Sequence, residues 1–144
     1  MFDLAYRFVT ETSENIFLTG KAGTGKTTFL KYLKENSTKN IIVAAPTGVA
    51  AINAGGVTLH SLFQLPFHPF LPTKINKEEL LAKIKFNKQR LTLLRKMELL
   101  VIDEVSMVRC DVMDAIDTIL KHARKNYQLP FGGTQILFIG DLYQ

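Results

Sequence analysis

The sequence has few of the features that stabilise secreted, membrane or zinc-binding proteins. It contains one cysteine, Cys110, so no disulfide framework can form within the chain, and a reducing compartment fits best. Its apolar stretches are too short to span a membrane, and its N-terminal segment lacks the basic start and apolar run of a signal peptide. His68 and His122 lack the spacing of metal ligands. We therefore expect neither a zinc site nor a membrane partner.

Length and composition indicate one ordinary globular domain. The 144 residues are typical of a single domain, and 47% hydrophobic residues are enough to build one core. We therefore predict one domain over residues 1–144. The net charge is +5, from 18 Lys and Arg against 13 Asp and Glu, and this modest positive excess favours polyanionic partners. On its own this excess does not identify a partner.

Four short apolar runs predict the strands of one parallel sheet. They are rich in Ile, Val, Leu or Phe and do not alternate with polar residues, which is typical of strands buried on both faces. Helical patterns lie between the runs, at Thr27–Lys34 and at Asp111–Lys125. Strands that alternate with helices predict a doubly wound α/β domain with right-handed crossovers. The four runs are Asn15–Thr19, Asn40–Ala45, Leu99–Ile102 and Gln135–Ile139.

The segment between the second and third runs fits this scheme least well. Pro66, Pro69 and Pro72 exclude a helix in its first part. The residues Glu78–Lys96 then have a helical and basic pattern. Lys74–Lys96 holds eight Lys or Arg and two Glu, a net charge of +6 that exceeds the charge of the whole chain. Two interpretations stay open: a solvated helix face, which is the commoner case, or a surface that follows a phosphate backbone.

Residues Gly20–Thr27 match the phosphate-binding pattern G-x-x-x-x-G-K-[ST], after a predicted strand and at the start of a predicted helix. The glycines let the backbone approach the phosphates because no Cβ intervenes, and N–H groups at the helix start hold the anion. Lys26 would contact the β- and γ-phosphates, and Thr27 would offer its hydroxyl to Mg²⁺. We therefore predict that ATP and Mg²⁺ bind here. The residues concerned are Gly20, Ala22, Gly23, Thr24, Gly25, Lys26, Thr27 and Thr28.

Two carboxylates, Asp103 and Glu104, directly follow the apolar run Leu99–Ile102. They would lie at the carboxyl edge of the sheet, where open α/β sheets bind ligands. Asp103 would hold Mg²⁺ through water, and Glu104 would orient and deprotonate the attacking water. We predict Lys26, Asp103 and Glu104 as catalytic residues, with Thr27 and Asp103 as the metal ligands. A solvated loop start is the alternative for such an acidic pair.

Two further groups of residues are candidates for ligand contacts. Ala44–Ala51 offers small residues after a strand, which permit the close approach of a ligand backbone. Thr47, His60 and Ser61 supply donors of the kind that bind phosphate oxygens, although a lone histidine such as His60 is more often structural. Gln144 follows the last predicted strand, and it is either a contact to the γ-phosphate or an ordinary polar residue.

Taken together, these elements resemble the PIF-type and RecD-like helicases of superfamily 1B. The similarity covers nearly the whole chain apart from residues 65–97, and its order and spacing resemble the first motor domain of that family. It is far more specific than the phosphate-binding pattern alone. The matching segments are Phe17–Thr28, Ala45–Ala51, Gly55–Phe63, Ile102–Val108, Pro130–Gly133 and Gly140–Gln144.

The resemblance implies an ATP-dependent DNA helicase that hydrolyses ATP to move 5′ to 3′ on single-stranded DNA and unwind duplex. It implies a RecA-like P-loop NTPase fold, a parallel sheet with helices on both faces, in which Gln135–Ile139 lies between the phosphate-loop strand and Leu99–Ile102. It also implies that Gln144 senses the γ-phosphate and assists catalysis. A cytoplasmic location, on the nucleoid in a bacterium, fits this activity. The implied DNA contacts are Pro46, Thr47, Gly48, His60 and Ser61.

Two features depart from the family pattern. Members often read adenine with a glutamine upstream of the phosphate loop, but the first glutamine here is Gln64, so adenine selectivity is not predicted. The sequence also ends at Gln144, before a second RecA-like domain whose arginines would complete the ATP site. We therefore expect a first motor domain whose partner is that second domain.

Two other classes of protein compete with the helicase. One is a P-loop ATPase of the AAA or transposition-helper type, which lacks unwinding activity, and Thr58–Ser61 favours the helicase over it. The other is a nucleotide-gated binding module that hydrolyses nothing, and Asp103 and Glu104 argue against it.

Overall fold

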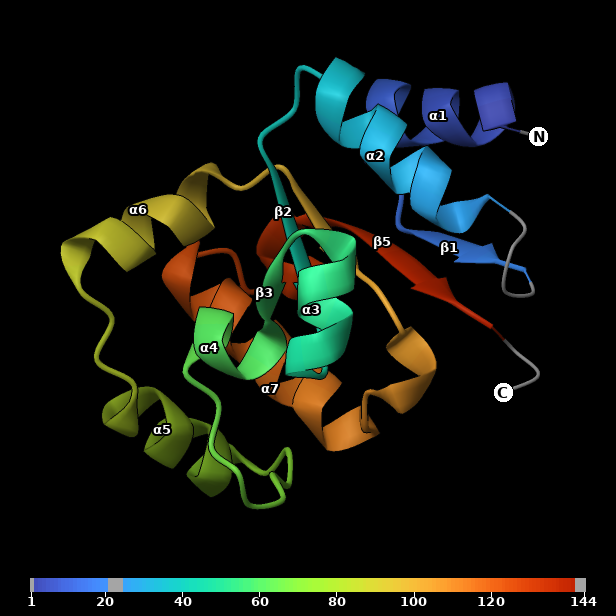
Figure 1. Cartoon of the computed structure of the whole chain (residues 1–144). Helices are drawn as coiled ribbons and strands as arrows, with labels where there is room; N and C mark the ends of the chain where they lie inside the picture. The colour runs from blue at the N-terminus through green and yellow to red at the C-terminus, as the bar shows by residue number, and fades with distance from the viewer. Residues whose placement is uncertain (1, 21–24, 142–144) are drawn as a thin grey trace.

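A computed structural model, which describes residues 2–20 and 25–141, contains a five-stranded parallel sheet with helices on both faces (Figure 1). The strands are β1 Ile16–Thr19, β2 Ile41–Ala45, β3 Val57–Thr58, β4 Leu99–Ile102 and β5 Gln135–Gly140. Their order across the sheet is β1-β5-β4-β2-β3. β5 therefore lies between β1 and β4, as the resemblance implied, and the predicted α/β class is confirmed.

The central strands carry the core of the molecule. Every residue of β4 is buried: Leu100 and Ile102 pack into one hydrophobic cluster, while Leu99 and Val101 pack into the other. The prediction that all four runs are buried on both faces is wrong for β1. Among the described strands β1 pairs with β5 alone, so it is an edge strand, and Phe17 is about half exposed.

Helices cover both faces of this sheet. On one face α1 (Phe2–Glu11), α2 (Lys26–Asn36) and α3 (Gly48–Ala54) contribute buried residues to the cluster around Leu99 and Val101. The other face is covered by α4 (Leu59–Phe63), α5 (Lys74–Lys83), α6 (Lys88–Lys96) and α7 (Cys110–Ala123). Short 3₁₀ turns, η1 (Val105–Met107) and η2 (Pro130–Gly133), precede α7 and β5.

The two helices predicted from periodicity are present as α2 and α7. In α2 the apolar stripe formed by Phe29, Leu30 and Leu33 is buried, as expected from its helical spacing. In α7 the buried face includes Ile116 and Leu120. In the described part of the chain, every helix is too short or too polar to cross a bilayer.

The basic segment forms two helices, α5 and α6, and the single helix predicted over Glu78–Lys96 is wrong. Ile84 and Phe86 lie between the two helices in non-helical backbone and pack against the core. Asn87 then starts α6, because its side-chain oxygen accepts a hydrogen bond from the backbone N–H of Arg90 at 2.8 Å. The proline-containing segment between α4 and α5 is non-helical, as predicted.

Candidate functional site

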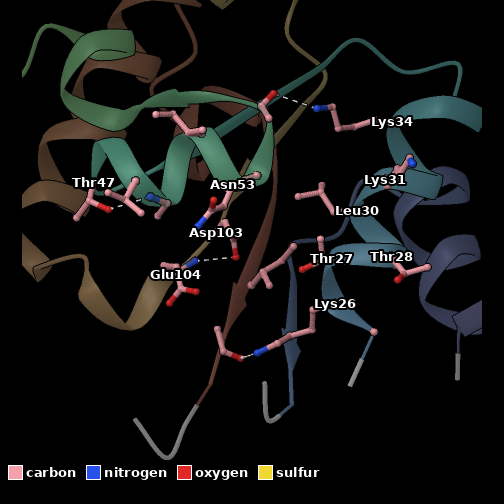
Figure 2. A pocket seen from close by; sticks show the side chains of 18 of the residues that line it. Lys26, Thr27, Thr28, Leu30, Lys31, Lys34, Thr47, Asn53, Asp103 and Glu104 are labelled. Carbon is pink, nitrogen blue, oxygen red and sulfur yellow. Dashed lines mark hydrogen bonds between the residues drawn. The ribbon is translucent and has the colours of Figure 1, made fainter. Parts of the chain in front are cut away.

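A cleft of about 1000 Å³ lies at the carboxyl edge of the sheet, between α2 and α3. Lysines of α2 line one wall, and two carboxylates lie at the end of β4. The cleft thus holds cationic and anionic groups in one hollow, as a site for a metal–phosphate ligand requires. Figure 2 shows Lys26, Thr27, Thr28, Lys31 and Lys34 on the α2 side, with Thr47, Asn53, Asp103 and Glu104 facing them.

The start of α2 has the features of an anion-binding site. Gly25 precedes the helix with φ +90° and ψ 9°, a left-handed conformation that favours glycine, and glycine has no side chain to cap the first N–H groups. Lys26 is the first residue of the helix, where the helix dipole disfavours a cation. A negative ligand at this position would balance both the dipole and the lysine charge.

The Lys26 ammonium lies where the ends of two strands meet. It donates hydrogen bonds to the carbonyl oxygen of Gly20, after β1, at 2.6 Å and to that of Gly140, at the end of β5, at 3.4 Å. Thr27 and Thr28 are exposed side chains that line the same cleft. Lys26, Thr27 and Thr28 therefore line one cleft, and Lys26 also contacts Gly20.

Asp103 and Glu104 form a turn directly after β4. The backbone N–H of Asp103 donates to the carbonyl of Ala44 at 2.9 Å, which continues the ladder between β2 and β4. Glu104 then leaves the strand in the left-handed region, at φ 53° and ψ 44°. Both side chains are partly buried in the cleft.

Gly140 fits closely against this turn. A Cβ at position 140 would lie 2.8 Å from the Cγ1 atom of Val105, the residue after Glu104, so a larger residue there would force the Val105 side chain to move. The carboxyl end of β5 and the acidic turn therefore share one boundary of the cleft. Thr27 and Asp103, the predicted metal ligands, line the same cleft and offer a hydroxyl and a carboxylate oxygen, the donor types that Mg²⁺ prefers.

The predicted DNA contacts lie after neighbouring strands. β2 and β3 pair in parallel with Ala45 opposite Thr58, so the segments that follow them leave the same edge of the sheet. Thr47 caps α3, since its hydroxyl accepts a hydrogen bond from the N–H of Ala50 at 3.2 Å. Thr58 caps α4 in the same way, through the N–H of Ser61 at 3.1 Å.

The remaining predicted DNA contacts belong to these same two segments. Pro46 is partly buried, whereas Gly48 and Ser61 are exposed. The space beside Gly48 is open, as the close approach of a ligand backbone requires. His60 is partly buried and stacks on Phe67. The structure therefore brings the two predicted groups to adjacent strand ends.

Sequence reasoning missed part of the lining of the cleft. Lys31 and Lys34 of α2, and Asn53 of α3, line it as well, and the Lys34 ammonium donates to the carbonyl of Gly55 at 3.0 Å (Figure 2). The sequence holds a signal for the missed helix α3. Thr47 is a typical N-cap and Gly55 a typical C-terminal glycine, and they bracket the helix.

Some predicted site residues lie outside the described residues, and their roles stay predictions. They are Ala22, Gly23 and Thr24 of the phosphate loop, and Gln144, the predicted γ-phosphate sensor.

The sequence profile of the family described as PIF1-like helicase matches residues 1–144. The ATP-dependent DNA helicase PIF1 of Candida albicans is 42% identical over 134 residues, which cover 90% of this chain and 14% of that protein. In the structure of Bacteroides Pif1 bound to ssDNA, the protein is 53% identical in sequence to this chain, and the two superpose with a TM-score of 0.88. The match covers 99% of this chain and 32% of the Bacteroides chain. Pif1 of Bacteroides sp in complex with ADP-AlF4 is 52% identical with a TM-score of 0.88, at the same coverage.

The chain therefore spans about a third or less of the length of these relatives. Its match to the family profile nevertheless runs over all 144 residues. The chain belongs to the PIF1-like helicase family.

Proposed function

We propose that this chain is the ATP-binding motor domain of an ATP-dependent DNA helicase that moves 5′ to 3′ on single-stranded DNA. The observation that carries the proposal is the cleft, in which the start of α2 with Lys26 faces the acidic turn of Asp103 and Glu104. Membership of the helicase family favours this function over an AAA-type ATPase. The 5′-to-3′ direction rests on the resemblance of the motifs to superfamily 1B.

In this proposal the side chains of the cleft divide the work of phosphoryl transfer. The Lys26 ammonium neutralises charge on the β- and γ-phosphates, next to N–H groups at the start of α2. Thr27 and Asp103 would hold Mg²⁺, which supplies further positive charge to the phosphates when bound. Glu104 orients the attacking water and accepts its proton. Gln144 would report the presence of the γ-phosphate.

Relatives support both ligands of the proposal. A Bacteroides Pif1 that is 52% identical has been solved with ADP-AlF4, and one that is 53% identical with ssDNA. In this chain the segments with Thr47 and with His60 and Ser61 leave adjacent strand ends, and Thr47 also lines the cleft. A ligand on these segments would therefore contact residues next to the nucleotide. We propose single-stranded DNA as that ligand and a second RecA-like domain as the partner that closes on the cleft.

The proposal is tested by steady-state ATP hydrolysis with a polypeptide of the length of its relatives. We expect single-stranded DNA to stimulate hydrolysis, and the polypeptide to unwind a duplex with a 5′ single-stranded tail but not one with a 3′ tail. Hydrolysis that is indifferent to DNA would reject the helicase in favour of an ATPase of another type. Unwinding of the duplex with a 3′ tail would reject the proposed 5′-to-3′ direction but would still support a helicase motor.

A further inference from the structure

Phe67 differs from the other phenylalanines of the described chain in its high exposure to solvent. With 88% of the residue exposed, it is the most exposed large apolar side chain in the described part of the molecule. Single exposed apolar residues are common on protein surfaces and need no explanation by themselves. The fixed position of this ring is what makes it informative.

The segment from Leu65 to Phe70, called the strap here, is anchored at both ends. It connects α4 with the stretch that leads to α5 (Figure 1). Leu65 and Phe70 are both buried in the core, at 6% exposure each. The N–H of Phe70 also donates to the Asp111 carboxylate at 3.0 Å. With both ends anchored, the strap holds Phe67 out into solvent.

Prolines stiffen the strap around this ring. Pro66 directly precedes Phe67, and Pro69 directly precedes the anchored Phe70. Proline fixes its own φ and restricts the residue before it, so the backbone is restricted at Leu65 and Pro66 on one side of Phe67 and at His68 and Pro69 on the other. A displayed side chain on such a backbone loses little conformational freedom when a ligand binds it.

The Phe67 ring already forms half of a stack. It lies parallel to the imidazole of His60, with 6° between the planes and 5.4 Å between the ring centroids. Its high exposure leaves the face away from His60 open to solvent. A third flat ring could therefore extend the stack of His60 and Phe67 on that open face.

We propose that Phe67 is the stacking platform for one base of the single strand whose backbone passes His60 and Ser61. This inference rests on the proposed DNA binding and adds a base contact to it. Every base has a π-face, so such a contact adds affinity without reading sequence. The strap also leads into Lys74–Lys96, whose net charge of +6 suits a polyanion better than an apolar protein partner.

The test compares Phe67→Ala, Phe67→Leu and Phe67→Trp with the unchanged chain, by fluorescence anisotropy on a labelled oligothymidine. Phe67→Ala should weaken binding by about five- to 150-fold, and Phe67→Leu nearly as much, while Phe67→Trp should retain affinity. The dependence of affinity on salt should stay unchanged, because no phosphate contact is lost. Leu71→Ala is the matched control, since Leu71 is 64% exposed just beyond the strap, and it should bind like the unchanged chain.

A second oligonucleotide, with abasic sites in place of its bases, isolates the stacking contact. On this strand the unchanged chain and Phe67→Ala should bind equally. If Phe67→Ala lost the same affinity on both strands, or if Phe67→Leu bound oligothymidine with full affinity, the stacking platform would be overturned. The proposed DNA binding would still stand. If the unchanged chain bound neither strand, the proposed DNA binding would fail and the platform with it.

Discussion

The side-chain carboxylate of Asp103 accepts a hydrogen bond from the backbone N–H of Glu104, with 2.9 Å between oxygen and nitrogen. Glu104 occupies the left-handed region, which costs a residue other than glycine about 1–3 kcal/mol. The hydrogen bond offsets part of that cost, so the strained turn is maintained. Glu104 thereby faces the cleft and does not continue β4.

We predict that Glu104→Gln leaves ATP binding nearly intact and abolishes most turnover. Glutamine keeps the shape of the side chain but cannot accept the proton of the attacking water. Turnover should fall by about 10²–10⁴-fold. The measurement is steady-state hydrolysis with single-stranded DNA, in a polypeptide of the length of the relatives. Asp114→Asn, at an exposed carboxylate of α7, is the control and should keep full turnover. Near-normal turnover of Glu104→Gln would assign the base to another residue.

We predict that Lys26→Ala weakens the binding of ATP with Mg²⁺ by about 10- to 150-fold. The reason is the loss of a charge-assisted contact, which is worth about 1.5–3 kcal/mol. Titration with a fluorescent ATP analogue measures the dissociation constants. Lys31→Ala provides the control, because Lys31 lines the same cleft from the same helix but lies outside the motif. Equal dissociation constants for Lys26→Ala and the unchanged chain would contradict the phosphate-loop assignment.

Continuous apolar runs predicted four of the five strands, and helical periodicity predicted α2 and α7, because most of the apolar residues in these elements pack into the core. It missed α3, in which the pattern is inverted. Val49 and Ile52 are more than 70% exposed beside the cleft, while the small residues Ala51 and Ala54 are buried. It also missed β3, whose two residues, Val57 and Thr58, are too few to show a period. Apolar residues that line a cleft therefore mislead a prediction based on burial.

The candidate site was predictable where its residues are close in sequence and depend on local geometry. Gly25, Lys26 and Thr27 follow from the phosphate-binding pattern, and Asp103 from its place after a buried strand. The bond from Lys34 to Gly55 and the stack of His60 on Phe67 depend on how helices and loops pack together. Tertiary packing of this kind leaves no fixed spacing in the sequence.

We predict that the affinity for single-stranded DNA depends little on its sequence and falls steeply as salt is added. Contacts from Thr47 and Ser61 would go to phosphate and sugar, which are the same at every nucleotide. Anisotropy with strands of different sequence over a range of salt concentrations measures both properties. A strong preference for one base, or affinity independent of salt, would count against backbone contacts.

The same experiment separates a ligand contact from helix capping. The N-cap bond of α4 uses the backbone N–H of Ser61, so Ser61→Ala keeps the cap and removes only the hydroxyl. Thr47→Ala would also remove the α3 cap, at a cost of about 1 kcal/mol, whereas Thr47→Ser retains it. We expect Ser61→Ala to weaken DNA binding without changing the free energy of unfolding. If Ser61→Ala lost stability but bound DNA normally, Ser61 would have a structural role and would not contact DNA.

Asp111 of α7 holds the strap to that helix, because its carboxylate accepts the N–H of Phe70. The N–H of Phe70 lowers the pKa of this carboxyl below its ordinary value, with a smaller contribution from Arg109, whose Nε lies 3.0 Å from the carboxylate. A folded-state pKa below the unfolded value means that the ionised form stabilises the fold. That stability is fully present above the unfolded pKa of 3.8 and is lost as pH falls through the folded pKa.

Asp111→Asn should therefore lower the free energy of unfolding by only about 0.2–1 kcal/mol at pH 7, because the charge lost belongs to a solvent-exposed pair with Arg109. The amide oxygen of asparagine can still accept the N–H of Phe70, so the strap should stay attached, and only the charge is removed. Urea unfolding at a series of pH values from 7 to 3 measures the difference between the two proteins. We expect that difference to be constant at the upper end of the series and to shrink below pH 3.8, as the wild-type carboxyl is protonated. A difference that stayed constant down to pH 3 would show that the charge of Asp111 does not stabilise the strap.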